Sequence, residues 1–158
     1  MADIVDPYTR SRMMSGIRGK DTKPELMIRK ALHARGYRYR LHCPDLPGKP
    51  DLCLAKYRAV ILVHGCFWHG HGCNLFKWPS TRPDFWKAKI GRNKQLDDEV
   101  VDRIAALGWR YAVVWECALK GRRNIGLSEV VDKLAAWLES DTLKLTIRGA
   151  TDACDEPS

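Results

Sequence analysis

The residues best suited to chemistry lie between His64 and Cys73, a segment that holds three histidines and two cysteines. Cys66, His71 and Cys73 are close enough in the sequence to bind one metal ion, and Cys117 follows a later apolar run. If the two preceding strands end side by side, these four side chains form a Cys₃His site, the usual closed coordination of structural zinc. Such a site has no open position, so we expect it to fix the loop rather than to react.

The alternative is that these thiols are incidental core residues, the interpretation we give to Cys43, Cys53 and Cys154. The chain starts without the basic and then apolar run of an export signal, so we expect its six cysteines to be reduced in a cytosolic protein. Clustered cysteines in that compartment favour metal over disulfides. No apolar segment approaches the roughly 18 residues that a membrane span requires.

Acidic residues form a second candidate site. Asp51 stands at the start of an expected strand, and Val63 and His64 stand at the end of its expected partner. With Glu25 from the first helix and a backbone carbonyl, Asp51 would offer Mg²⁺ the oxygen ligands it prefers. Such an ion stabilises charge that develops at a phosphate and can supply hydroxide. Each acid also has a structural explanation, a strand-start turn for Asp51 and a capping box with Thr22 for Glu25.

His64 and His69 could contact a phosphate or act as a general base, although a single histidine is more often an ordinary hydrogen-bonded residue. Phe67 and Trp68 lie between them on an expected loop, where large apolar side chains are costly unless they contact a partner. Stacking on nucleobases would provide that partner. Trp86 could extend the same surface or pack under the long helix that it begins.

The composition fits one domain that binds a polyanion. The chain has 158 residues and a formal net charge of +8. That charge favours phosphate-rich partners because basic side chains displace counterions, although it also fits a merely soluble basic protein. We expect a basic arm over residues 1–20, a domain over 21–148 and a disordered tail over 149–158. Met14 and Ile17 of the arm would either wedge into a minor groove or dock on the domain.

Hydrophobic periodicity and capping residues predict the elements. A helix begins at Thr22 and ends near Gly36, and strands follow over 37–41, 52–55 and 59–63. The predicted order is α-β-β-β-α-β-α, completed by a helix over 84–107, a strand over 109–115 and a helix over 128–138. The residues that contribute apolar side chains to the pattern of the long helix are Phe85, Ile90, Leu96, Val100, Ile104 and Leu107.

The motifs together resemble one family. They are Arg12-Met-Met-Ser-Gly-Ile-Arg18 with Lys20-Asp-Thr-Lys-Pro-Glu25, Pro47-Gly-Lys-Pro-Asp51, His64-Gly-Cys-Phe-Trp-His-Gly-His-Gly-Cys73 and Trp115-Glu-Cys117. This pattern, over about residues 8–140, is similar to the very short patch repair (Vsr) DNA mismatch endonucleases. The resemblance implies a restriction-endonuclease-like α/β domain, with a central mixed β-sheet flanked by helices and a structural zinc. It also implies Mg²⁺-dependent nicking of one strand 5′ of the thymine in a T·G mismatch left by deamination of 5-methylcytosine.

The resemblance assigns catalytic roles by position. Asp51 and the carbonyl of Val63 would bind Mg²⁺, and Glu25 would reach the ion through water. His69 would be the base that activates the attacking water, and His64 would hold the phosphate region. The usual acid-plus-lysine element of this nuclease superfamily is absent after Asp51, and Val63 and His64 occupy that place.

The resemblance also assigns metal-binding and DNA-binding residues. The implied zinc ligands are Cys66, His71, Cys73 and Cys117. The implied DNA contacts are Phe67, Trp68 and Trp86 by intercalation from the major groove, Met14 and Ile17 in the minor groove, and Lys89 and Asn93 at base edges. The expected enzyme is a monomer at the nucleoid in the bacterial cytoplasm, with mismatch-repair and repair-synthesis proteins as further partners. The rival hypotheses are a zinc-stabilised protein that binds mismatches without cleavage, and a nicking endonuclease of the same fold with a relaxed preference for the mismatch or the flanking sequence.

Overall fold

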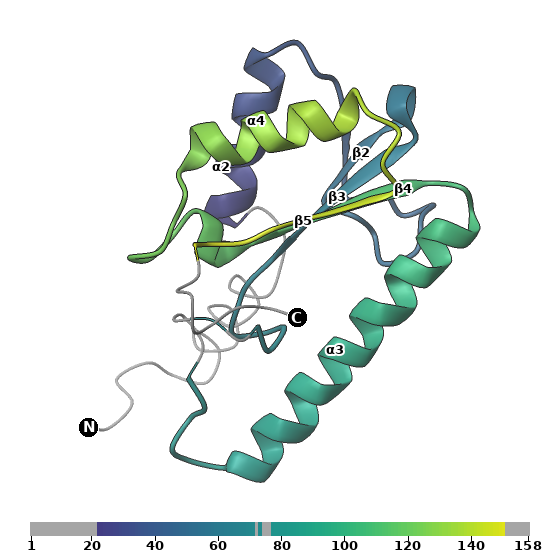
Figure 1. Cartoon of the computed structure of the whole chain (residues 1–158). Helices are drawn as coiled ribbons and strands as arrows, with labels where there is room; N and C mark the ends of the chain where they lie inside the picture. Colours follow the sequence, from purple (N-terminus) through teal and green to yellow (C-terminus); the bar gives the residue numbers. More distant parts are fainter. Residues whose placement is uncertain (1–21, 72, 74–76, 151–158) are drawn as a thin grey trace, which may run out of the picture.

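The protein is described by a computed structural model that covers residues 22–71, 73 and 77–150. Its helices are α2 (Lys23–Ala34), α3 (Pro83–Ala106) and α4 (Leu127–Leu138), and its strands are β1 (Arg40–Leu41), β2 (Leu52–Leu54), β3 (Ala59–His64), β4 (Arg110–Trp115) and β5 (Lys144–Ile147) (Figure 1). Two short 3₁₀ turns, η1 (Ala55–Tyr57) and η2 (Glu116–Ala118), follow β2 and β4.

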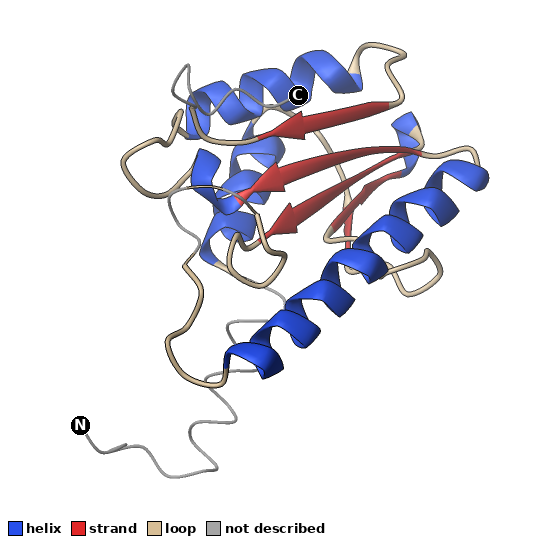
Figure 2. Ribbon diagram, turned by 60° about the horizontal axis from the view of Figure 1, so that its bottom comes forward, coloured by secondary structure: helices blue, strands red, loops and turns tan. Residues whose placement is uncertain are grey.

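The five strands form one mixed sheet in the order β1-β2-β3-β4-β5. The β1, β2 and β3 strands pair antiparallel, whereas β3, β4 and β5 pair parallel. Helices α2 and α4 lie on one face of the sheet and α3 crosses the other (Figures 1 and 2). The predicted mixed sheet flanked by helices is therefore confirmed.

The main core lies between the sheet and the α2–α4 layer. Side chains such as Ile28 and Leu32 of α2 and Leu134 of α4 are fully buried in it together with Leu52 and Ile61 of the sheet. A smaller core on the opposite face joins Cys43, Cys53 and Val60 to Ile104 of α3. Burying one such aliphatic side chain contributes about 1.5–3 kcal/mol. These two cores hold β2 and β3 rigidly, and the candidate site begins where those strands end.

Two strand predictions need correction. The alternating run 37–41 forms a strand only over Arg40–Leu41. Tyr39 instead donates its hydroxyl proton to the carbonyl of Arg29 in α2, at 2.7 Å. The β5 strand was missed because Lys144–Ile147 is a short edge strand whose only buried residue is Ile147, and so few residues carry little periodicity.

The long helix is more exposed than its pattern predicts. Ile90 and Ile104 are buried, but Phe85, Leu96 and Leu107 are 44%, 51% and 52% exposed. The N-terminal half of α3 extends past the strands, as Figure 1 shows, so the sheet covers only part of its apolar side. Of the six apolar residues in the pattern of this helix, Ile90 and Ile104 are therefore the ones that are fully buried.

The capping box predicted at the start of α2 is absent. Thr22 occupies the N-cap position, but its side chain makes no capping hydrogen bond. Glu25 is 1% exposed and its carboxylate accepts hydrogen bonds from Arg29 and His42 inside the protein. The carboxylate of Glu25 is thus held inside the protein by these two partners.

Both predicted terminal segments lie mostly outside the described residues. Met14, Ile17 and the rest of the arm fall there, as do residues 151–158. At the start of the expected tail, the amide of Gly149 donates a hydrogen bond to Cys117 Sγ at 3.3 Å, and the amide of Ala150 donates one to the carbonyl of Arg123 at 2.7 Å.

None of the helices within the described ranges is long and apolar enough to cross a bilayer.

Candidate active site and metal centres

The parallel pairing of β3 and β4 brings the candidate residues together. His64 is paired with Trp115 at the ends of these strands, and Cys66 and Cys117 each follow two residues later. Because the two parallel strands end at the same end of the sheet, the loop after β3 and the η2 turn after β4 lie side by side. This placement was the condition set for a Cys₃His group.

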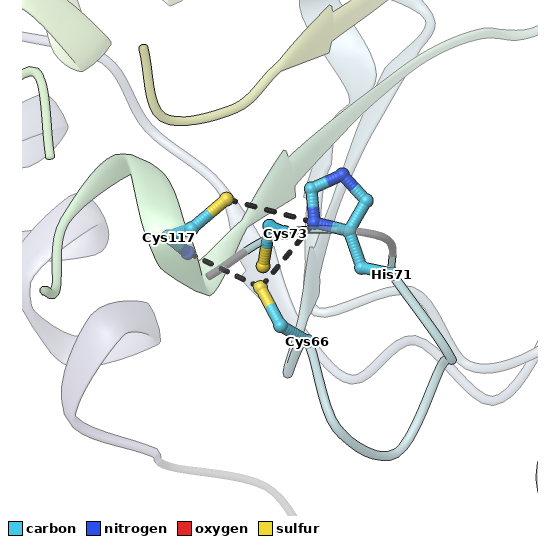
Figure 3. A group of neighbouring side chains, drawn as sticks. All are labelled: Cys66, His71, Cys73 and Cys117. Atoms are coloured by element: carbon cyan, nitrogen blue, oxygen red, sulfur yellow. Dashed lines mark hydrogen bonds between the residues drawn. The ribbon is translucent and has the colours of Figure 1, made fainter. Parts of the chain in front are cut away.

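The four predicted zinc ligands, Cys66, His71, Cys73 and Cys117, form one group, here called the sulfur cluster. One ligand atom from each lies within 4.8 Å of all the others. His71 Nδ1 is 3.5 Å from Cys66 Sγ and 3.6 Å from Cys117 Sγ (Figure 3). Three thiols and one imidazole nitrogen that converge on a single point are the donor set that zinc prefers.

The charge state of the sulfur cluster suits a cation. The hydrogen bond from Cys66 lowers the pKa of Cys117 to about 4, with further help from His71 and the Gly149 amide. The same hydrogen bond and burial raise the pKa of Cys66. Cys117 is therefore the thiol of this pair that ionises more readily, and the thiolate is the form that binds metal. Gly149 is needed for this packing, because a Cβ there would lie 2.6 Å from the Cys117 carbonyl oxygen.

Glu25, His42 and Asp51 form a second group, here called the carboxylate cluster. Their ligand atoms also lie within 4.8 Å of one another. Asp51 Oδ2 accepts the amide of Val63 at 2.7 Å, and Glu25 Oε2 lies 2.8 Å from His42 Nε2. Burial, with the charge of Glu25 nearby, raises the pKa of Asp51 to about 7. The carboxylates of buried Glu25 and half-buried Asp51 repel each other at this distance unless a proton or a cation lies between them.

This donor set fits the divalent ion that the resemblance implies. Carboxylate oxygens are the ligands that Mg²⁺ prefers. Because the N–H and C=O of one strand residue point to the same side, the amide of Val63 that contacts Asp51 directs the Val63 carbonyl toward the same place. Asp51 and Glu25 are thus brought together and His42 is an addition, whereas the role of the Val63 carbonyl as a ligand stays a prediction.

His64 and His69 form a stacked pair beside Asp97 of α3. Their ring centroids are 3.9 Å apart with an interplanar angle of 7°, and His69 Nδ1 lies 2.5 Å from Asp97 Oδ2. Burial, together with the charge of His69, lowers the pKa of His64 to about 3. Its buried Nδ1 has no hydrogen-bond partner among the described residues. His64 is therefore neutral near pH 7, whereas His69 is oriented by a carboxylate.

Trp115 connects the histidine pair to the sulfur cluster. Its ring stacks on His71 with centroids 4.1 Å apart and an interplanar angle of 6°. It meets the His64 ring edge-on at 5.2 Å. Aromatic contacts of this kind contribute about 0.5–1.5 kcal/mol each. The sulfur cluster thus supports the ring against which His64 lies.

Phe67, Trp68 and Trp86 form an aromatic cluster between the loop and the start of α3. Phe67 is 5.1 Å from Trp68 and 5.3 Å from Trp86, and Trp68 is 5.7 Å from Trp86, measured between ring centroids. All three are partly exposed. Trp86 therefore belongs to the surface formed by the loop, and does not pack in the core under α3.

The two predicted base-edge residues follow Trp86 on α3. Asn93 donates its side-chain amide to the carbonyl of Trp68 at 2.8 Å. In this conformation Asn93 thus fixes the loop that carries the aromatic cluster. Lys89 is half-buried, one turn after Trp86, and its predicted contact with DNA stays a prediction.

The sequence reasoning missed four residues of this region. They are His42, Asp97, Trp115 as a ring contact, and Gly149. Asp97 lies 28 residues from His69 in the sequence and sits among other acids in Asp97-Asp98-Glu99, so nothing local distinguishes it. His42 directly follows the predicted strand 37–41, whose end lies opposite Asp51, and that pairing was the one available indication.

Comparison with known proteins gives a consistent match. A family model described as DNA mismatch endonuclease Vsr matches residues 2–75. The chain is 44% identical over 138 residues to a protein of Escherichia coli K12 named DNA mismatch endonuclease Vsr, covering 87% of this chain and 88% of that one.

Relatives with a second kind of name match as well. A Xanthomonas oryzae protein named type II nicking enzyme V.XorIIP is 48% identical over 134 residues, covering 84% of this chain and 98% of its own. A Neisseria meningitidis protein named type II nicking enzyme V.NmeAIP is 43% identical over 122 residues, covering 77% of this chain and 87% of its own.

Proposed function

Because this chain belongs to the Vsr family of DNA mismatch endonucleases, we propose that it nicks one strand of duplex DNA on the 5′ side of the thymine in a T·G mismatch. Such mismatches arise when 5-methylcytosine deaminates. We place this DNA endonuclease in the restriction-endonuclease-like fold class and in the bacterial cytoplasm, at the nucleoid. We further propose that it works as a monomer and hands the nick to mismatch-repair and repair-synthesis proteins.

One observation carries the proposal: a metal-binding carboxylate, a phosphate-binding histidine and a histidine base lie next to one another at the end of β3. The Val63 amide contacts Asp51 of the carboxylate cluster, the next residue is His64, and His64 stacks on His69. A pure DNA-binding module needs neither two carboxylates held close together nor a histidine oriented by an acid. This arrangement supports cleavage over binding alone.

Asp51 and the Val63 carbonyl would hold a catalytic Mg²⁺, with Glu25 reaching it through water. When bound, this ion supplies positive charge to the scissile phosphate and acidifies a bound water. The carboxylate of Asp51 must be ionised to bind a cation, and its raised pKa of about 7 means that this occurs near neutral pH. Cys66, His71, Cys73 and Cys117 would hold a structural Zn²⁺ away from the reacting phosphate.

His69 is well arranged to act as general base. With its proton on Nδ1, His69 donates a hydrogen bond to Asp97. The lone pair on Nε2 is then able to take a proton from water. His64, which stays neutral because burial lowers its pKa to about 3, would contact the phosphate region as a hydrogen-bonding group. Its stacking on His69 also fixes the plane of the base.

The aromatic cluster supports recognition of a distorted duplex. Phe67, Trp68 and Trp86 present edge-to-face rings at a partly exposed surface that adjoins His69. Inserting such rings beside a mispair costs less than opening a fully paired step, and each stacked base returns about 1–3 kcal/mol. Met14 and Ile17, outside the described residues, would act from the minor groove, and Lys89 and Asn93 would contact base edges.

A second candidate function is nicking with a relaxed preference for the mismatch or its flanking sequence. It is favoured by the names of the relatives from Xanthomonas oryzae and Neisseria meningitidis, type II nicking enzymes that match this chain at 48% and 43% identity. The catalytic groups would be the same. Only the stringency with which the aromatic cluster rejects paired DNA would differ.

The decisive experiment maps nicks in end-labelled duplexes that contain T·G, T·A, C·G or T·C at one position, in several flanking contexts, with Mg²⁺. We expect one nick 5′ of the thymine in T·G duplexes alone, and none with Asp51→Asn, which keeps an acceptor for the Val63 amide. Equal nicking of T·G and T·A duplexes would establish the relaxed enzyme instead. Mismatch binding without any nick would refute both endonuclease proposals.

A further inference from the structure

The carboxylate cluster contains a nitrogen donor that the oxygen-ligand site proposed above does not use. His42 follows β1, and its amide donates to the Asp51 carbonyl at 3.2 Å, which places it directly opposite Asp51 across the strand pair. Its ring turns inward to Glu25, where Nε2 lies 2.8 Å from Oε2. The side chain of His42 is only 17% exposed and that of Glu25 only 2%.

The backbone supports this orientation at a cost. His42 has a φ of 47°, in the left-handed region that non-glycine residues seldom adopt. Strained backbone of this kind persists where the surroundings fix it, and it gathers at functional sites. The strain is what places the His42 ring beside two acids.

The distances fit a single ion. The nearest donor atoms of Glu25, His42 and Asp51 lie within 4.8 Å of one another. Ligands about 2.1 Å from a common ion are separated by up to about 4.2 Å, so a contraction of a few tenths of an ångström would bring all three into one coordination sphere. Arg29, at 2.9 Å from Glu25 Oε2, already fixes one side of that carboxylate.

We propose that His42 is a third side-chain ligand of this divalent-metal site, that Glu25 binds the ion directly beside Asp51 and not through the water assumed above, and that the site therefore binds Mn²⁺ more tightly than the catalytic Mg²⁺. The inference rests on the proposed nuclease function, whose metal site it deepens. Mg²⁺ is bound by oxygen and discriminates against imidazole, whereas Mn²⁺ accepts both carboxylate and imidazole. A site of two carboxylates, one imidazole and waters is therefore better matched to Mn²⁺.

The test is spectroscopic and needs neither DNA nor turnover. The zinc-loaded protein is mixed with one equivalent of Mn²⁺, and pulsed electron paramagnetic resonance reads the hyperfine coupling of any nitrogen bound to manganese. We expect a directly bound nitrogen in the wild type, identified by its shift when the histidines are isotope-labelled. It should be absent in His42→Asn, since asparagine tolerates positive φ but carries no imidazole.

His33→Asn is the matched control, because His33 lies exposed on the same helix as Glu25 and should leave the coupling unchanged. Isothermal titration supplies the second readout. The ratio of the Mg²⁺ to the Mn²⁺ dissociation constant should fall about 10–100-fold in His42→Asn, as expected when a ligand or its support is lost. It should not change in His33→Asn.

Three results would overturn the inference: no nitrogen coupling in the wild type, a coupling that survives in His42→Asn, or no manganese bound. If His42→Asn does not fold, His42→Gln takes its place, because manganese bound at His64, His69 and Asp97 would also give the wild type a histidine coupling. None of these results bears on whether the protein nicks T·G duplexes with Mg²⁺. Failure of the ligand assignment and failure of the proposed function are therefore separable.

Discussion

The sulfur cluster and the carboxylate cluster lie at the same end of the sheet, yet they are built in opposite ways. Three of the four residues in the first come from one loop, Cys66–Cys73, and only Cys117 is distant. The second draws each residue from a different element, Glu25 from α2, His42 from the end of β1 and Asp51 from the start of β2. The first can organise its own loop when it binds a metal, whereas the second exists only after the sheet and α2 have assembled.

Their chemistry differs in the same direction. Sulfur donors with one imidazole form a complete tetrahedron, which suits a permanent ion that holds structure. Carboxylates leave coordination positions open, and Asp51 is kept partly protonated near neutral pH by burial. We expect loss of the first cluster to affect the fold and loss of the second to affect the reaction.

The largest expected effect is from Cys117→Ser, which removes the ligand that joins the loop to η2 and leaves three donors. We expect the variant to retain no tightly held zinc. Its free energy of unfolding should fall by several kcal/mol, and its unfolding temperature should fall with it, because metal binding at such a site is coupled to folding. Elemental analysis and thermal denaturation measure both effects. The wild type should hold one zinc per chain.

Cys53→Ala provides the control for Cys117→Ser. Cys53 is a buried thiol of the smaller core and should cost some stability while leaving the zinc in place. Full stability of Cys117→Ser without zinc would show that the loop does not depend on the metal.

How far the sequence predicts this region follows from the same contrast. The spacing of Cys66, His71 and Cys73 revealed the sulfur cluster directly, and strand periodicity supplied Cys117. The carboxylate cluster was only partly predictable, because Glu25 could equally have been a capping residue and His42 carries no local pattern. Its third residue depends on strand pairing and on a left-handed backbone at His42.

The same limit applies to the fold. Strands β3 and β4 and all three described helices were predictable, since each has enough residues for a hydrophobic period, and the short β2 was predictable because all of its residues are apolar and buried. The β1 and β5 edge strands have two and four residues and are mostly exposed. Their place in the sheet is set by tertiary contacts, which the sequence pattern does not encode.

The next effect in size concerns the base that acts beside the carboxylate cluster. Asp97→Asn should slow single-turnover nicking of a T·G duplex by about 10²–10⁴-fold, because the amide no longer holds His69 in the tautomer that accepts a proton at Nε2. DNA affinity should change little, since Asp97 faces His69 and no DNA contact is assigned to it. Quenched-flow cleavage and a separate binding titration distinguish the two.

Asp98→Asn, one residue further on the exposed side of α3, is the matched control for Asp97→Asn and should nick at the wild-type rate. A second readout tests orientation specifically: the rising limb of the pH–rate profile should shift in Asp97→Asn and not in Asp98→Asn. Equal rates and equal profiles for both variants would remove the role of Asp97.

The smallest expected effect is the pH dependence of stability, which Asp51→Asn in the carboxylate cluster should change. Burial raises the pKa of Asp51 in the folded protein to about 7 from an ordinary value of 3.8, so the folded state keeps a proton that the unfolded chain releases above about pH 4. Asp51 therefore does not lower the free energy of unfolding below that pH, and it lowers this free energy increasingly as the pH rises to about 7. Asp51→Asn, which cannot ionise, should match the wild type at pH 4 and exceed it above pH 7 by about 1–4 kcal/mol.

Chemical denaturation of zinc-loaded protein without added Mg²⁺, repeated from pH 4 to pH 8, measures the difference in free energy of unfolding between Asp51→Asn and the wild type. Addition of Mg²⁺ or Mn²⁺ should narrow the gap at high pH, because a bound cation stabilises the ionised carboxylates of the wild type. The same additions should not narrow the gap between Cys117→Ser and the wild type, because both proteins keep the carboxylate cluster and gain the same stability from the cation. A gap that does not vary with pH would mean that Asp51 is ionised in the folded protein throughout, and that the carboxylate cluster carries no electrostatic strain for a metal to relieve.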